Sequence, residues 1–306
     1  MMTKAADNGE ITIDALSPAG SGEIVNLSHN PLELRALRNG FLTIGAWMVA
    51  ALGAVPLVSV IFMLVIKGGA RLGKELFTEL PPAGFELGGG IGNAIQGTLV
   101  TVAIASAISI PVALLAAIYL AEFRPESKIA TSARFLSKVL TGFPSILAGV
   151  FVYAAVVLLM GSYSALAGGI ALAVLMLPTV TLTAEGAMRM VPQRMKDAAI
   201  GMGCTRSQVV WSVTLPTALP SIVTGVILAV ARVAGESAPL LFTALFSNYW
   251  LRSIREPTAS LSILIYNFSS MPFDNQIELA WAASLVLVLI VLTFNILSRF
   301  IGRPQV

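Results

Sequence analysis

The chain has 306 residues, of which 56% are hydrophobic and only 11% are charged, and its formal net charge is +3. A soluble domain carries about 25% charged residues, so this composition excludes a water-soluble globule and indicates an integral membrane protein. The single cysteine, Cys204, excludes an internal disulfide, and no Cys/His cluster in the sequence suggests a metal site. A basic balance in a membrane protein reflects topology and gives no reason to expect a nucleic-acid partner.

The first 40 residues differ from the rest of the chain. They mix acidic residues, Ser, Pro and Gly without a sustained apolar period, which is typical of a flexible tail. The lone histidine, His29, lies in this stretch and is expected to be solvated. The first apolar run begins at Phe41 and is too long for a cleavable secretory signal. We therefore expect a flexible N-terminal tail over 1–40 and a membrane domain over 41–306.

Six stretches after the tail are apolar enough to cross the hydrocarbon core, which takes about 20 helical residues. The uncharged run from Val139 to Ala184 is too long for one helix, and the Gly-Ser-Tyr-Ser turn at 161–164 divides it. The expected fold is therefore an all-α membrane protein with about six transmembrane helices. The expected spans are 41–66, 94–121, 142–160, 164–184, 215–236 and 279–300.

The distribution of Lys and Arg predicts the orientation of these spans. With the N-terminus inside, the inner segments hold 13 of the 19 basic residues and the outer loops hold 5. Both termini and the segment 185–214 should then face the cytoplasm, and 237–277 should form a long outer loop. Within that loop, Pro239–Leu251 is apolar enough for a re-entrant helix but too short to span.

The segment 192–214 carries the signals of two short helices joined by a tight turn. Pro192 suits the first turn of a helix, where its missing N–H costs nothing. Gly203 permits the backbone conformation that ends a helix. Thr205 and Gln208 have capping-box spacing for a second helix, which would continue into the fifth span. The segment is interpreted as a docking surface, and an ordinary helical hairpin between two spans is the alternative.

This segment resembles the cytoplasmic "EAA" loop of the permeases of ABC importers. In that family the loop fits a cleft on the ATPase subunit and transmits its motion. Asp197 stands where the family has Glu, and Val213 stands where it has Ile. The small side chains of Ala198 and Ala199 are expected to leave one face of the first short helix open for close packing. The resemblance implies an ATPase-coupling role for Asp197, Ala198, Ala199, Gly203, Leu215 and Pro216.

Further segments narrow the resemblance to the PstA-type permeases of phosphate importers, over about 41–300. The most diagnostic part is 235–241, in which Ser237 stands where the family usually has Thr. The segments that carry the resemblance are 93–99, 142–146, 177–178, 190–192, 219–225 and 231–241.

The resemblance implies the type I ABC importer permease fold in the bacterial inner membrane. The implied partners are a second permease of the PstC type, two copies of a PstB-type ATPase and an external PstS-type phosphate-binding protein. The sequence has no Walker glycine loop, so this chain is not expected to be an enzyme or to hold a cofactor. ATP and Mg would be bound by the partner ATPase.

Two charges, Arg232 and Glu236, lie one helical turn apart near the outer end of the fifth span. Charges at membrane depth are costly unless they are paired or face water. One interpretation is a self-neutralising pair that fixes helix packing. The other is that Arg232 lines the substrate pathway and attracts an oxyanion, while Glu236 moderates this attraction so that the ion can be released. Hydroxyls of Thr98, Ser145 and Ser237 would supplement this pathway site.

Three alternative functions are weighed against phosphate import. The cargo could be another oxyanion such as sulfate or molybdate, against which only the resemblance argues. An intramembrane enzyme needs a nucleophile with a base, or metal ligands, and the expected spans contain no His, Asp or Cys. An ATP-independent ion channel would leave the docking loop unexplained.

Overall fold

The computed structural model describes residues 34–301, which contain helices and loops and no strand. The chain divides into two compact units, residues 1–61 and 62–306. The first unit holds nearly all of helix α1, Leu34–Met63. It extends the first expected span, 41–66, at its amino end, where the Leu, Arg and Ala residues at 34–38 are strong helix formers. The rest of the predicted tail, with His29, lies outside the described residues.

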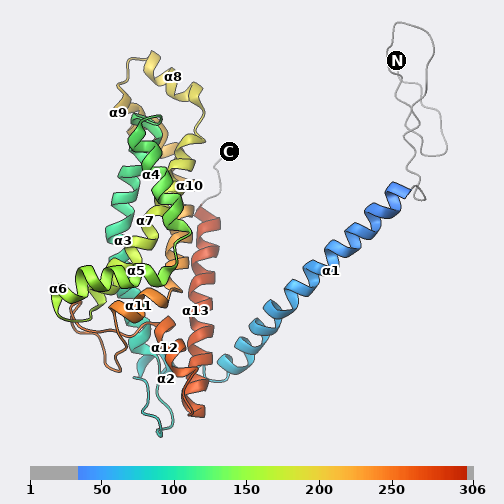
Figure 1. Ribbon diagram of the computed structural model, residues 1–306, viewed down its shortest axis with the longest axis vertical. Helices are drawn as coiled ribbons and strands as arrows, with labels where there is room; N and C mark the ends of the chain where they lie inside the picture. Colours follow the sequence, from blue (N-terminus) through green and yellow to red (C-terminus); the bar gives the residue numbers. More distant parts are fainter. Residues whose placement is uncertain (1–33, 302–306) are drawn as a thin grey trace. The chain divides into compact units, whose positions relative to one another are not determined.

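The second unit is a bundle of helices (Figure 1). Its α-helices are α2 (Lys74–Thr78), α3 (Gly92–Ile118), α4 (Lys128–Thr141), α5 (Ser145–Val152), α6 (Leu158–Met160), α7 (Ala165–Arg189), α8 (Gln193–Gly201), α9 (Arg206–Val209), α10 (Leu215–Ala234), α11 (Ala238–Thr243), α12 (Leu261–Phe268) and α13 (Asp274–Ile301). Four π-helical segments extend or join them: η1 (Leu64–Gly68), η2 (Tyr119–Phe123), η3 (Tyr153–Val157) and η4 (Val210–Thr214).

Five helices of the described chain are long and apolar enough to cross a membrane, and a bent pair can supply a sixth crossing. The five are Arg38–Gly68, Gly92–Phe123, Ala165–Arg189, Arg206–Ala234 and Asp274–Phe300. Each contains most of one expected span, and all are extended at one or both ends by polar or charged residues. Hydropathy alone marks the apolar middle of a helix and not its ends.

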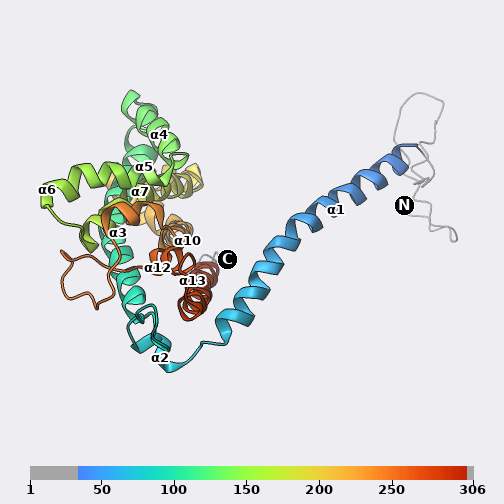
Figure 2. The ribbon, with the colours of Figure 1, turned by 60° about the horizontal axis from the view of Figure 1, so that its bottom comes forward.

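The third expected span, 142–160, has a different form from the other five. Its helical part runs through α5, η3 and α6 and is shorter than the ~20 residues that a straight crossing needs. It is long and apolar enough to cross a membrane only together with α4, and the two helical parts meet at an angle of 106°. The break falls at Pro144, whose ring disfavours helical geometry at Phe143. As a result, α5 runs across α3 and α7 (Figures 1 and 2).

Small residues allow the central helices to pack closely. Ala105 and Ala113 of α3 and Ala173 of α7 belong to one buried cluster, together with residues of α10 and α11. The bent span approaches α11 closely at Gly149 on α5, where an added Cβ would lie 2.6 Å from the Cα of Pro239. This contact fixes α5 against α11.

The segment 239–251, which was apolar enough for a re-entrant helix, contains only one short helix, α11. α11 covers the beginning of Pro239–Leu251, and Pro239, Leu240 and Thr243 are buried. The chain then leaves the helix, with Leu245 at a φ of 57°. Side chains of α3 hold the following loop: the Asn93 amide donates to the Ser247 carbonyl at 2.8 Å.

Candidate functional site

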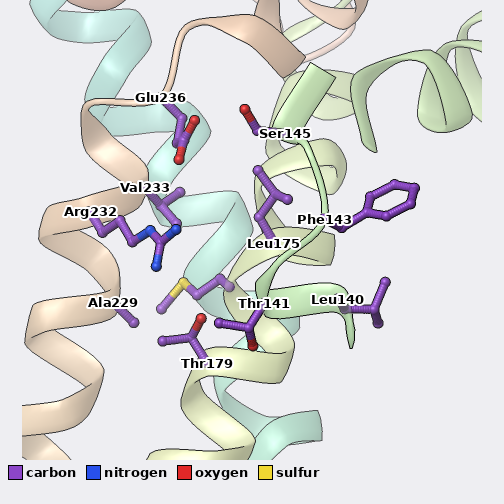
Figure 3. A pocket seen from close by; sticks show the side chains of 11 residues that line it. Leu140, Thr141, Phe143, Ser145, Leu175, Thr179, Ala229, Arg232, Val233 and Glu236 are labelled. Carbon is purple, nitrogen blue, oxygen red and sulfur yellow. The ribbon is translucent and has the colours of Figure 1, made fainter. Parts of the chain in front are cut away.

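A small pocket lies where α10 ends, beside the break between α4 and α5. It is lined by Leu140, Thr141, Phe143, Ser145, Leu175, Met176, Thr179, Ala229, Arg232, Val233 and Glu236, and its volume is about 30 Å³. Figure 3 shows Arg232 and Glu236 extending toward this space from α10 and the turn directly after it, and Ser145 from the start of α5. The structure therefore brings together three of the five expected pathway residues. This space has room for only a few water molecules, so the pocket is narrow in this conformation.

Arg232 and Glu236 do not form an ion pair in the described structure. α10 ends at Ala234, and Glu236 lies in the turn after it, where its N–H donates to the Val233 carbonyl at 3.1 Å. The i,i+4 geometry of a continuous helix is therefore lost. Among residues 34–301, neither side chain has an ion-pair or hydrogen-bond partner. Arg232 is exposed and Glu236 is partly buried.

The amino end of α5 also faces this pocket. Pro144 is the N-cap residue and supplies no side-chain cap, and Ser145 is the first helical residue. The first N–H groups of a helix have no partner within it, and the helix dipole places partial positive charge there. Together with Arg232, this end creates a local environment that favours an anion.

Thr98 and Ser237, the two other expected pathway residues, do not line this pocket. The Thr98 hydroxyl donates to the Ala94 carbonyl at 2.8 Å and accepts from the Leu261 N–H at 2.9 Å. Thr98 therefore joins α3 to α12, and its only hydroxyl proton is donated within α3. Ser237 precedes α11 and makes no side-chain cap.

The helical hairpin expected between the fourth and fifth spans is present as α8 and α9. Gly203 has a φ of +95°, and the Gly203 N–H donates to the Ile200 carbonyl as α8 ends. Thr205 and Gln208 form the predicted capping box at the start of α9. α9 continues through η4 into α10, where Leu215 and Pro216 occupy the first turn.

The exposure of α8 differs from the expectation at one of the two alanines that should form its open face. Asp197 and Ala198 are exposed, but Ala199 is only 3% exposed. α8 packs back against α9 and η4, and the Cys204 N–H donates to the Ala199 carbonyl, which turns residue 199 inward. The exposed apolar surface of this region comes instead from larger side chains, which are Met190, Met195, Ile200, Met202 and Trp211.

Two groups of ion pairs lie at the end of the bundle that carries α8. Lys196 on α8 pairs with Glu122 in η2 at 2.6 Å. Glu185 on α7 accepts from Arg134 on α4 at 2.6 Å and from Arg189 at 2.9 Å.

The sequence analysis did not single out these charged residues, nor Thr141 and Thr179 in the pocket. Each acidic residue does interrupt or end a long apolar stretch, which is a signal that it needs a partner. The partners are distant in sequence, however, and spacing alone does not identify them.

The model of the family described as "Binding-protein-dependent transport system inner membrane component" matches residues 109–303. The chain belongs to this family. The matched region contains the residues of the pocket, of both ion-pair groups and of the α8–α9 hairpin.

Among known proteins, the chain is 40% identical to the phosphate transport system permease protein PstA of Yersinia pestis, over 81% of this chain and 84% of that protein. It is 36% identical to the probable phosphate transport system permease protein PstA of Methanocaldococcus jannaschii, over 92% of this chain and 98% of that protein. The predicted family resemblance is thereby confirmed.

Solved structures confirm the fold. A chain of a bacterial alginate ABC transporter has a TM-score of 0.62 and 16% identity, over 90% of this chain and all of that chain. A chain of the MetNI methionine ABC transporter has a TM-score of 0.56 and 19% identity, over 70% of this chain and 95% of that chain. The fold is that of type I ABC importer permeases, as expected from the sequence.

Proposed function

We propose that this chain is the permease subunit of an ATP-driven phosphate importer and forms half of its translocation pathway. The names of its relatives support phosphate as the cargo. The observation that carries the proposal is an arginine, Arg232, that lines a pocket within the bundle and has no acidic partner among the described residues.

The chemistry of the pocket suits a tetrahedral oxyanion. The guanidinium of Arg232 offers a planar fork that matches two phosphate oxygens. The amino end of α5 adds partial positive charge, and the hydroxyls of Ser145 and Thr179 can donate hydrogen bonds. Glu236 lowers the net attraction, which a pathway needs in order to release its ion. Glu236 also provides an acceptor for the proton of protonated phosphate, which a fully deprotonated oxyanion lacks.

The α8–α9 hairpin, residues 193–209, is the proposed contact with the ATPase, which would bind ATP and Mg and perform the hydrolysis. Its exposed methionines and Ile200 supply an adaptable apolar surface. The complete transporter would contain a second, PstC-type permease, two PstB-type ATPase subunits and an external PstS-type binding protein. Both termini would face the cytoplasm, as the distribution of basic residues predicts.

Phosphate uptake in cells that lack this chain tests the proposal. Expression of the wild-type chain should restore uptake of radiolabelled phosphate, and excess sulfate or molybdate should not compete. In the purified complex, the phosphate-loaded binding protein should stimulate ATP hydrolysis. Uptake of sulfate or molybdate in place of phosphate would overturn the assignment of the cargo. Transport without any ATP dependence would overturn the assignment to an importer.

A further inference from the structure

The ion pair between Lys196 and Glu122 joins the α8–α9 hairpin to a membrane helix. Lys196 Nζ lies 2.6 Å from Glu122 Oε1, and the two side chains are only 10% and 12% exposed. An unpaired charge at this depth would be strongly destabilising, so the two side chains must stay within contact distance of each other. Lys196 Nζ also lies 3.5 Å from the Met188 carbonyl in the last turn of α7.

The pair is distinctive because of what it connects. The main backbone neighbours of α8 are α9 and η4, which follow it directly in the chain. Within residues 34–301, the bond from Lys196 to Glu122 is the only hydrogen bond or ion pair between α8 and the Gly92–Phe123 helix. A displacement of α8 therefore has one direct polar route to α3.

η2, which carries Glu122, is held from a second direction by α4. Arg134 Nη2 donates to the Leu120 carbonyl at 2.8 Å, while its Nε contacts Glu185 of α7 at 2.6 Å. η2 is the last turn of the Gly92–Phe123 helix, and single π turns are frequent at functional sites. η2, at the end of α3, is thus a junction that contacts α8 through Lys196 and α4 through Arg134.

From this junction the connection continues to the anion pocket. α4 carries Arg134 at its middle and ends at Thr141, which lines the pocket. The break at 142–144 follows, and then Ser145 begins α5 on the other side of the same pocket. A rotation or shift of α4 would change the distance between Ser145 and Arg232.

We propose that Lys196 and Glu122 are positioning residues that couple movement of α8 to α3 and, through Arg134, to the pocket around Arg232. The pair makes no contact with ATP or with the transported ion. It determines how much of the ATPase movement reaches the pathway. This inference rests on the proposed function as an ATP-driven importer, but not on the identity of the ion.

The test uses the complete transporter, with its partner permease, ATPase and binding protein, in proteoliposomes. Radiolabelled phosphate uptake and ATP hydrolysis are measured on the same preparation of the wild type, Lys196→Met, Glu122→Gln and the charge swap Lys196→Glu with Glu122→Lys. The matched control is Lys128→Met, which removes an exposed lysine without an ion-pair partner in the described chain.

The single variants should assemble and hydrolyse ATP at near wild-type rates, while phosphate transported per ATP falls at least tenfold. The swap should recover at least half of the wild-type ratio, and Lys128→Met should leave the ratio unchanged. An unchanged ratio in both single variants would overturn the proposal. Loss of assembly in the singles, or equal loss of hydrolysis and uptake that the swap does not repair, would also overturn it in favour of a purely structural pair.

The two proposals fail in distinguishable ways. If the wild-type complex carries sulfate or molybdate and not phosphate, the cargo assignment fails, and the transport ratio is measured with the ion that is carried. If the wild type transports phosphate with normal stoichiometry and every variant matches it, only the coupling role of Lys196 and Glu122 fails.

Discussion

Arg134 Nε lies 2.6 Å from Glu185 Oε1, which places a basic residue of α4 against an acidic residue of α7 whose side chain is only 7% exposed. The same oxygen accepts a second bond from Arg189 at 2.9 Å. The two arginines differ in their surroundings. Arg134 also donates to the carbonyls of Pro125 and Leu120, whereas the Arg189 side chain is 48% exposed.

Arg134→Met should therefore lower the stability of the protein much more than Arg189→Met. Loss of Arg134 leaves a nearly buried carboxylate with one half-exposed partner, and breaking a buried pair costs about 3–5 kcal/mol. Loss of the exposed Arg189 should cost about 0–1 kcal/mol. Melting temperatures of the two purified variants in detergent give the comparison. Equal shifts would mean that the three bonds of Arg134 contribute nothing beyond those of Arg189.

The charge of Arg232 should be required for transport. Arg232→Gln retains length and some hydrogen bonding but removes the charge, so phosphate uptake should fall at least tenfold at normal membrane abundance. Arg232→Lys should restore it only in part, because a point charge cannot hold two oxygens in one plane.

The double change Arg232→Gln with Glu236→Gln serves as the control. A packing pair predicts that removing both charges restores transport, whereas an anion site predicts that uptake stays low. Since the two side chains form no ion pair in the described structure, we expect no recovery. Full uptake by the neutral double variant would place the anion elsewhere.

Any side chain at Gly203 should be unfavourable, for a reason that lies in the backbone of this residue. Its φ of +95° is strained for any L-residue, although an added Cβ would meet no atom within 4 Å. Gly203→Ala should cost about 1–2 kcal/mol locally and reduce uptake, and Gly203→Asp, which adds a charge, should abolish it. Gly201→Ala is the matched control, because Gly201 is helical and also has open space around it. Normal uptake and ATPase binding by Gly203→Asp would contradict the docking role of the hairpin.

The orientation of the chain can be tested with reporters. An enzyme that is active only in the cytoplasm should be active when fused after Val306 and inactive when inserted near Ser253. This follows from the excess of Lys and Arg in the segments expected to lie inside. The same activity at both positions would contradict the six-span topology, in which one span, 279–300, separates Ser253 from Val306.

Local signals in the sequence were sufficient to predict the α8–α9 hairpin. Gly203 and the Thr205–Gln208 capping box act over a few residues, so neither depends on the rest of the fold. The separation of Arg232 from Glu236 also had a local signal that was not used: Gly235 lies between them, and glycine commonly follows a helix end.

The features that sequence reasoning did not find depend on tertiary packing. The bend at Pro144 lies within an uninterrupted apolar run, where hydropathy alone predicts a straight helix. The pairing of Glu122 with Lys196 spans 74 positions in the chain, and nothing in either neighbourhood specifies the other. The burial of Ala199 follows from how α8 folds back on α9, which the motif does not encode.

The π-helical segment η2 also has a geometric consequence for α3. Each α-helical residue advances the direction of its side chain by about 100°, and a π turn accommodates one residue more than an α turn. The Tyr119–Phe123 turn is the last turn of this helix, because Arg124 has a φ of −141° and a ψ of 65° and leaves it. Side chains in a π turn are spread over smaller angular steps than in an α turn, so Glu122 does not point where a regular continuation of α3 would direct it. The wider last turn therefore sets the direction from which the Glu122 carboxylate meets Lys196.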